Sequence, residues 1–197
     1  FAVPPDSLDY WRDRLESRGV TVEDRERFDD SLLRFSDPAD TRIELVAADA
    51  TVDPYADGGI PAKYAIRGIH GVTALPVDPF QTASVLETLG LENVGQDGDR
   101  VRYRADGEYA TVVEIVDAGA TTNRRESDRG ETDAANAAGE AGDGDDASAF
   151  DPTGFGREGV GTIHHVAVRV PDEDALFAYH DLFRERDVSV SRVRDRH

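Results

Sequence analysis

The stretch IHGVTALPVDPFQTASVLETLGLENV, residues 69–94, decides the fold because it passes from one kind of regular element to another and back. It begins with a short β-like run, continues with a helix-like stretch and ends with a second β-like run. The spacing of apolar residues distinguishes strand-type runs from helix-type runs. The stretch therefore predicts a strand–helix–strand unit.

Two further stretches follow the same plan, residues 1–22 and residues 163–190. In both, a valine ends the first strand and a Pro-Asp turn follows, and an aspartate near a helix N-terminus is favoured by the helix dipole. The expected apolar helix faces consist of Leu8, Trp11 and Leu15 in the first copy and of Leu176, Tyr179 and Phe183 in the last. One plan that occurs at three places predicts an internally repeated fold.

Each of the first two copies continues with two more β-like segments, separated by turn-forming residues. They are residues 31–38 and 41–48 in the first copy, and residues 100–107 and 109–117 in the second. The sequence thus predicts an α+β fold built from βαβββ repeats. The first repeat covers residues 1–60 with a truncated first strand, the second covers residues 61–117, and residues 161–197 are the first half of a further repeat.

The composition changes between the second repeat and the last segment. Residues 118–160 are rich in Ala, Gly, Asp and Glu and contain few large apolar residues. Such a segment cannot bury enough apolar surface to offset the entropy lost on ordering. We expect it to be an acidic insert or linker that is disordered in part.

The charge balance excludes several classes of partner. The 197 residues include 41 Asp and Glu against 22 Lys and Arg, which gives a formal net charge of −19. Such a surface repels nucleic acid and anionic membranes, and no apolar run is long enough to cross a bilayer. The absence of cysteine excludes disulfides, thiolate metal sites and cysteine nucleophiles. With Lys63 as its only lysine, the composition resembles that of cytoplasmic proteins of salt-adapted microbes.

Three strings resemble the vicinal oxygen chelate superfamily, which includes glyoxalases, bleomycin-resistance proteins and extradiol dioxygenases. They are FAVPPDSLDYWRDRLESRGV, GIHGVTALPVDPFQTASVLETLGLENVG and GTIHHVAVRVPDEDAL, and their order is most similar to the four-unit ring-cleaving dioxygenases of the hydroquinone type. The resemblance implies that paired repeats form a curved, mostly antiparallel sheet cup of the glyoxalase type. Because the chain begins with Phe and lacks Met, it is expected to be a fragment that holds most of the family's second unit, all of the third and half of the fourth.

The resemblance also implies a metal bound by a histidine on a unit's first strand and a glutamate on a last strand. In this chain it indicates His165 as a ligand, with the other ligands outside the chain and with no catalytic side chain assigned. Successive strand residues point to opposite faces, so His164 is expected on the far face. Fe(II) is the expected metal and Mn(II) the second choice, with O₂ and a small aromatic diol or hydroquinone as substrates. The chain alone is then expected to be inactive.

A second candidate metal site consists of His70, Glu114 and Glu44, together with a histidine expected before residue 1. The two glutamates occupy corresponding positions on the last strands of their repeats, and His70 has the first-strand position that His165 has in the last segment. If they bind a metal, the resemblance implies a glyoxalase-like lyase or isomerase with Ni or Zn. The same residues are compatible with relics of duplication that bind no metal. A cup without metal would suit a non-catalytic, ligand-sequestering protein of the bleomycin-resistance type. These alternatives stay open at this point, and a homo-oligomer is compatible with each of them.

Overall fold

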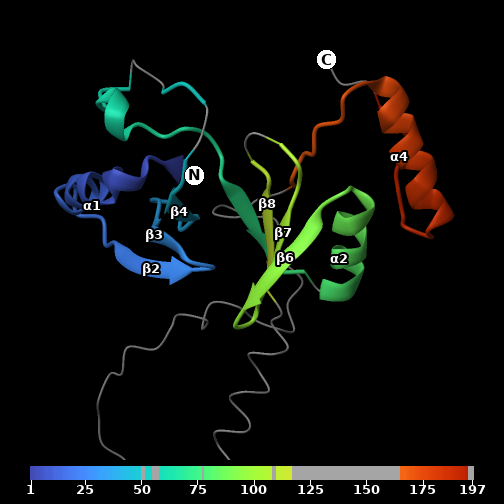
Figure 1. The fold of residues 1–197 in the computed structure, drawn as a ribbon, viewed down its shortest axis with the longest axis horizontal. Helices are drawn as coiled ribbons and strands as arrows, with labels where there is room; N and C mark the ends of the chain where they lie inside the picture. Colours follow the sequence, from blue (N-terminus) through green and yellow to red (C-terminus); the bar gives the residue numbers. More distant parts are fainter. Residues whose placement is uncertain (50–51, 55–57, 77, 108–109, 117–164, 195–197) are drawn as a thin grey trace, which may run out of the picture.

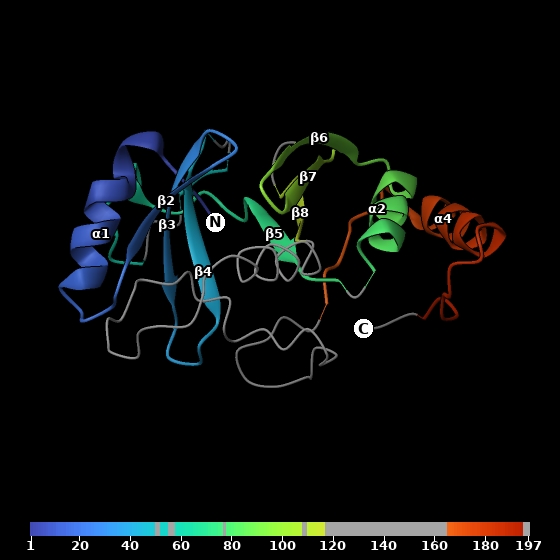
Figure 2. The same ribbon diagram turned by 90° about the horizontal axis from the view of Figure 1, so that it is seen from below.

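The computed structural model describes residues 1–49, 52–54, 58–76, 78–107, 110–116 and 165–194. The predicted insert at residues 118–160 and His164 lie outside the described residues. Two sheets stand side by side, and a helix covers the outer side of each (Figures 1 and 2). Within the described ranges, no helix combines the length and the apolar character that a membrane crossing requires.

The first repeat forms one four-stranded sheet with the order β1-β4-β3-β2. Its elements are β1 (Ala2–Val3), η1 (Pro5–Ser7), α1 (Leu8–Glu16), β2 (Glu23–Arg27), β3 (Asp30–Ser36) and β4 (Arg42–Ala47). The pairs β2/β3 and β3/β4 are antiparallel, whereas β1 pairs in parallel with β4. The first strand of the repeat therefore closes the sheet against the last.

The second repeat has the same topology, with the order β5-β8-β7-β6. After η2 (Ala62–Tyr64) its elements are β5 (Gly71–Ala74), α2 (Pro79–Thr88), β6 (Glu92–Asp97), β7 (Arg100–Arg104) and β8 (Val112–Val116). Again the first strand pairs in parallel with the last, and the other two pairings are antiparallel. The predicted α+β fold of repeated, mostly antiparallel βαβββ units is confirmed.

Each repeat has a small apolar core between its helix and its sheet. The first core consists of Val3, Trp11, Leu33 and Leu45, and the second of Leu86, Leu91, Tyr103 and Ile115. Burial of one such side chain contributes about 1.5–3 kcal/mol relative to exposure. The Trp11 indole Nε1 also donates a hydrogen bond to the Tyr64 carbonyl, at 2.8 Å, which ties the first helix to the segment that leads into the second repeat.

Aspartate caps start two of the three α-helices described. The Asp78 side chain accepts a hydrogen bond from the Gln81 amide at 2.9 Å, and Pro79 occupies the first helical turn. The Asp172 side chain accepts one from the Ala175 amide at 2.8 Å, at the start of α4 (Glu173–Glu185). These bonds satisfy amide groups that have no partner inside the helix. The Pro-Asp pair at residues 171–172 therefore starts a helix, as the sequence predicts.

The segment before α4 forms no strand in residues 165–170, although its sequence pattern is strand-like. In each of the first two repeats the first strand pairs with the last strand of the same repeat. The described residues from 165 onward include no later strand that could serve this purpose, and a strand needs a hydrogen-bonded neighbour. The helix itself lies beside α2 in both views (Figures 1 and 2), where the Arg186 guanidinium donates to Thr88 Oγ1.

Candidate functional site at the junction of the two repeats

Glu44 lies at the centre of β4 and faces two arginines. The β3/β4 register places Arg34 directly opposite, and its Nε lies 3.1 Å from Glu44 Oε1. Arg27, at the end of β2, binds both carboxylate oxygens, with Nη1–Oε1 at 3.0 Å and Nη2–Oε2 at 2.5 Å. Burial by itself would raise the pKa of Glu44, but the hydrogen bonds and charges of Arg27 and then Arg34 lower this pKa to about 2.

Glu114 occupies the corresponding position in the second repeat and has an equivalent arginine opposite. Arg102, its partner across the β7/β8 ladder, donates to Glu114 Oε1 from Nη2 at 2.7 Å and from Nε at 3.1 Å. Arg100 Nη1 lies 3.5 Å from Glu114 Oε2, and Thr73 Oγ1 donates to the same oxygen at 3.4 Å. The Glu114 side chain is only 4% exposed, so its negative charge is balanced by neighbouring groups rather than by water.

Arg27 connects the two glutamates. While its Nη atoms contact Glu44, its Nε lies 3.1 Å from Glu114 Oε2; the distance suits an ion pair, although the N–H is not aligned for a hydrogen bond. Burial alone would lower the pKa of the 9% exposed guanidinium, but Glu44 and Glu114 outweigh this effect and raise the pKa. One arginine of the first repeat thus bridges the last strands of both repeats.

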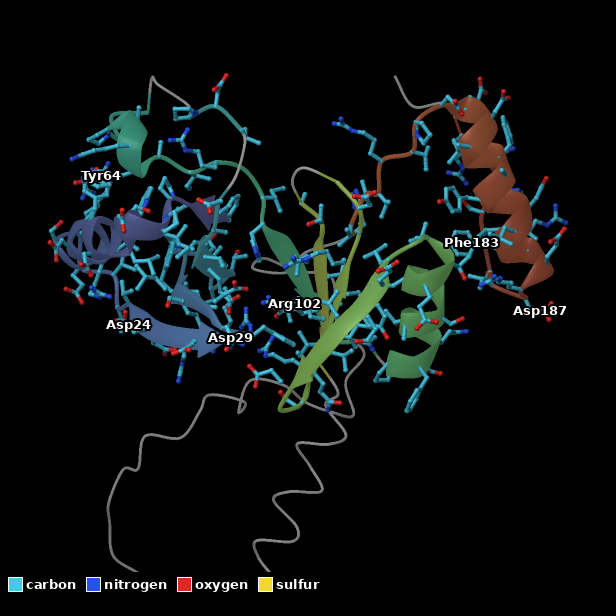
Figure 3. The ribbon with its side chains drawn as sticks, in the orientation of Figure 1. Asp24, Asp29, Tyr64, Arg102, Phe183 and Asp187 are labelled. Atoms are coloured by element: carbon cyan, nitrogen blue, oxygen red, sulfur yellow. The ribbon has the colours of Figure 1, made fainter. Side chains whose placement is uncertain are left out.

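A second connection runs in the opposite direction. Arg102 of the second repeat donates from Nη1 to Asp30 Oδ2 of the first repeat at 2.5 Å, and its Cζ lies 4.2 Å from the centre of the Phe28 ring. Figure 3 shows Arg102 on the side of the second repeat that faces the first. Across the same boundary, the Phe28 amide donates to Asp97 Oδ2 at 3.0 Å. We call Arg27, Asp30, Arg34, Glu44, Arg100, Arg102 and Glu114 the junction network.

His70, immediately before β5, lies at the edge of the junction network and is half-buried. Burial lowers the pKa of His70 and is the largest influence on it. The negative charge of Asp30 raises this pKa, whereas the positive charge of Arg102 lowers it further. The imidazole is therefore neutral at neutral pH. The structure thus brings His70, Glu44 and Glu114, the residues of the second candidate site, to one junction.

The side chains at this junction do not fit a metal ion. Four guanidinium groups face three carboxylates, and oxygens of both glutamates are already engaged by arginines. Among the residues that the structure describes, no group of three or more His, Asp or Glu side chains is placed to hold a metal. His165 lies elsewhere, exposed in the segment before α4, and its role as a ligand stays a prediction.

The arginines of the junction network were not found from the sequence, although one signal was available. Both repeats carry an arginine on the third strand, opposite the glutamate of the fourth: Arg34 in LLRFS and Arg102 in RVRYR. An arginine that recurs beside buried apolar residues at equivalent places indicates a partner inside the structure, because lone buried charges are costly. The bridging role of Arg27 has no such local signal.

An open cleft of about 560 Å³ lies beside the network, between the β2–β3 turn and the strands β6 and β7. Phe28, Gln96, Arg102 and Arg104 are part of its lining. Its volume is in the range of small-molecule sites, but its lining is mixed in charge, because Asp29 and Asp97 also contribute. The cleft by itself therefore indicates no particular ligand.

No protein-family model matches the chain. Two Bacillus subtilis (strain 168) proteins align with all of it: "Putative ring-cleaving dioxygenase MhqO" is 28% identical and "Putative ring-cleaving dioxygenase MhqE" is 24% identical, each over 198 residues. The chain spans about half the length of these curated relatives, 53% and 54%. A crystal structure described as a "putative dioxygenase" of Bacillus subtilis subsp. subtilis str. 168 matches 99% of this chain and 53% of its own, with a TM-score of 0.75 and 28% identity.

The match in sequence and the match in fold therefore point to the same kind of protein, a putative dioxygenase. Both repeats and their order are found in a protein whose description names a dioxygenase. The matches extend over this chain from end to end, rather than over a single repeat. They confirm that the chain resembles putative ring-cleaving dioxygenases, over about half of the length of those relatives.

Proposed function

We propose that the chain is part of a metal-dependent dioxygenase that opens the ring of an aromatic diol or hydroquinone with O₂. The observation that carries this proposal is the 28% identity with MhqO over the whole chain. The match in fold, with a TM-score of 0.75 across both repeats, also supports the proposal and does not depend on the identity of any one residue. The substrates are then O₂ and a small aromatic molecule.

His165 is the metal ligand that this chain would supply. It precedes α4, is exposed in the described segment, and lies outside the junction network. A neutral imidazole nitrogen there would bind Fe(II), or Mn(II) as the second choice. When bound, such a metal would hold the deprotonated substrate beside O₂ and transfer electrons between them. The remaining ligands would come from parts of a longer protein, so the 197-residue chain alone would take up no O₂.

The test is O₂ uptake by a longer protein that contains this chain and spans the length of its relatives. After anaerobic loading with Fe(II), substituted hydroquinones and catechols should each be tried, and ring opening followed by absorbance. We expect His165→Ala to abolish metal retention and to lower O₂ uptake by at least about 100-fold. His180→Ala is the matched control, because His180 lies on α4 and contacts only its neighbour Asp181 among the interactions described for it.

Two results would contradict this assignment. Metal-loaded protein that consumes no O₂ with any of these substrates would count against the dioxygenase. Full metal retention and activity in His165→Ala would remove His165 from the site while leaving the dioxygenase itself in place. We further propose that the protein works in the cytoplasm of a salt-adapted microbe, a proposal supported by the net charge of −19.

A further inference from the structure

The two glutamates that the sequence marks as candidate metal ligands are both bound by arginine. Glu44 is held by Arg27 and Arg34, and Glu114 by Arg102 and Arg27. We propose that the junction network binds no metal, that the Arg27 guanidinium takes the place of a divalent cation between Glu44 and Glu114, and that the network serves to join the two repeats. This inference concerns a different site from the proposed catalytic one.

The balance of charge is the first argument. Four guanidinium groups share three carboxylates, so the network already carries an excess of positive charge. Arg100 shows the excess most clearly: burial, followed by repulsion from Arg27, lowers its pKa below the ordinary arginine value. A divalent cation would add two charges to this surplus in a region of low dielectric constant, where like charges repel strongly.

Burial supplies the second argument. The side chains of Glu114, Arg102 and Arg27 are 4%, 5% and 9% exposed. To bind a metal, Glu114 and Glu44 would have to release Arg27, and the released guanidinium would stay buried without a counterion. Removing one partner from a buried ion pair is much more costly than breaking an exposed pair. The arrangement therefore resists exchange of Arg27 for a metal.

The two hairpins that meet at the junction carry charge in opposite order. Arg27 and Asp30 close the β2–β3 hairpin, whereas Asp97 and Arg100 close the β6–β7 hairpin. Arg27, Asp30 and Asp97 all form contacts with the other repeat. Arg27 therefore meets a carboxylate of the second repeat, whereas Asp30 and Asp97 each accept a hydrogen bond from the other repeat.

The backbone at the tip of the first hairpin is also explained by this role. Phe28 and Asp29 have φ angles of 50° and 66°, a region that bulky residues rarely adopt. Such conformations persist where surrounding contacts hold them. Phe28 is held by contacts with the other repeat: its amide donates to Asp97 and its ring lies against Arg102. Asp29 sits at the same tip, which points toward the second repeat (Figure 3).

The first experiment measures metal binding directly, with the tag-free 197-residue chain and Mn(II), Ni(II) and Zn(II). Calorimetry and thermal unfolding should be compared between the natural chain and His70→Ala, which removes the third candidate ligand and leaves the ion pairs of the network in place. We expect the two proteins to show the same metal binding and the same metal-induced shift in melting temperature, because neither Glu44 nor Glu114 is available to a metal. Stoichiometric binding in the natural chain that His70→Ala abolishes would overturn the inference.

The second experiment tests whether charge pairing joins the repeats. Arg27→Met leaves two buried carboxylates short of a cation, and we expect its melting temperature to fall by about 10 °C or more. Glu44→Gln alone removes one of the two anions that Arg27 contacts, and adding Arg27→Met to it gives a double variant with the same excess of one positive charge as the natural network. We expect Arg27→Met to cost no more than half as much in the Glu44→Gln background as in the natural chain. A network without this role predicts a small effect of Arg27→Met that is the same in both backgrounds.

Arg27→Met does not need to be well folded for the inference to be tested. If it unfolds at room temperature while the Arg27→Met/Glu44→Gln variant folds, the result supports uncompensated charge as the cause. If both fail to fold while Glu44→Gln alone folds, charge pairing is not the reason for the loss, and the joining role is contradicted. The metal measurement on the natural chain is independent of either result.

Discussion

Arg27 and Glu114 belong to different repeats, yet both side chains are buried and Arg27 Nε lies 3.1 Å from Glu114 Oε2. Eighty-seven positions separate them in the chain. The same guanidinium contacts Glu44 of its own repeat. The last strands of the two sheets are therefore connected through one side chain, and changes at this point should affect stability far more than changes at exposed ion pairs.

Loss of Glu114 should be strongly destabilising. Glu114→Gln keeps the shape of the side chain but leaves Arg102 and Arg27 without a shared anion, and we expect it to lower the free energy of unfolding by about 3–5 kcal/mol. Glu23→Gln breaks the exposed pair with Arg25 and should cost less than about 1 kcal/mol. Urea unfolding of the two variants measures the difference. Equal effects would show that the buried pair contributes no more than a surface pair.

Acid should weaken the first repeat through Glu44. Its pKa lies at about 2 in the folded chain, well below the usual glutamate value, so its stabilising contribution is present above about pH 4.5 and is lost as the pH falls toward 2. A shift of this size corresponds to a contribution on the order of 3 kcal/mol at neutral pH. Urea unfolding at intervals between pH 6 and pH 2.5 should therefore show a shallower pH dependence for Glu44→Gln than for the natural chain. Parallel curves for the two proteins would contradict this assignment.

The β2–β3 turn should become more stable when Asp29 is replaced by glycine. Asp29 has a φ of 66° and is exposed, and a two-residue hairpin turn with positive φ at both central positions favours glycine at the second. We expect Asp29→Gly to raise the free energy of unfolding by about 0.5–1 kcal/mol. Gly98 gives the reverse comparison, because its φ is 59° with open space around the position of a Cβ. Gly98→Ala should cost about 1 kcal/mol through the backbone alone.

Salt should stabilise the chain. Mutual repulsion among the surface carboxylates of a chain with net charge −19 is screened as the Debye length shortens, whereas the buried junction network is screened much less. We expect the melting temperature to rise by about 5 °C or more between about 0.1 M and 2 M KCl. A fall over this range would mean that attractive ion pairs, rather than repulsion, dominate the electrostatics.

The βαβββ repeats could be predicted from the sequence because their signals are local. The alternation in residues 31–38 and 41–48 agrees with β3 and β4 to within two residues, and the helix-like runs agree with α1, α2 and α4. Each of these patterns is determined within a few residues by periodicity and turn chemistry. The similarity among the repeats then indicated that they share one topology.

The chemistry of the junction could be predicted only in part. Strand position is enough to place Glu44, Glu114 and His70 near one boundary, because the last strands of both repeats face it. Their partners could not be predicted, since Arg27 and Arg102 cross from one repeat to the other and no short-range pattern records such pairing. The strand expected at residues 165–170 fails for a related reason: its formation depends on a distant strand, not on its own alternation.

The parallel pairing of each repeat's first strand with its last has a consequence for the order of folding. Ala2 pairs with Val46, and Gly71 with Val112, so each sheet is completed only after the whole repeat has been synthesised. During synthesis the first strand stays extended and unpaired until the other strands of its repeat have been added. Residues 165–170 show what such a segment exposes, with Val166 and Val168 each more than half accessible to solvent. A nascent repeat of this kind is open to pairing with strands of other molecules until its last strand arrives.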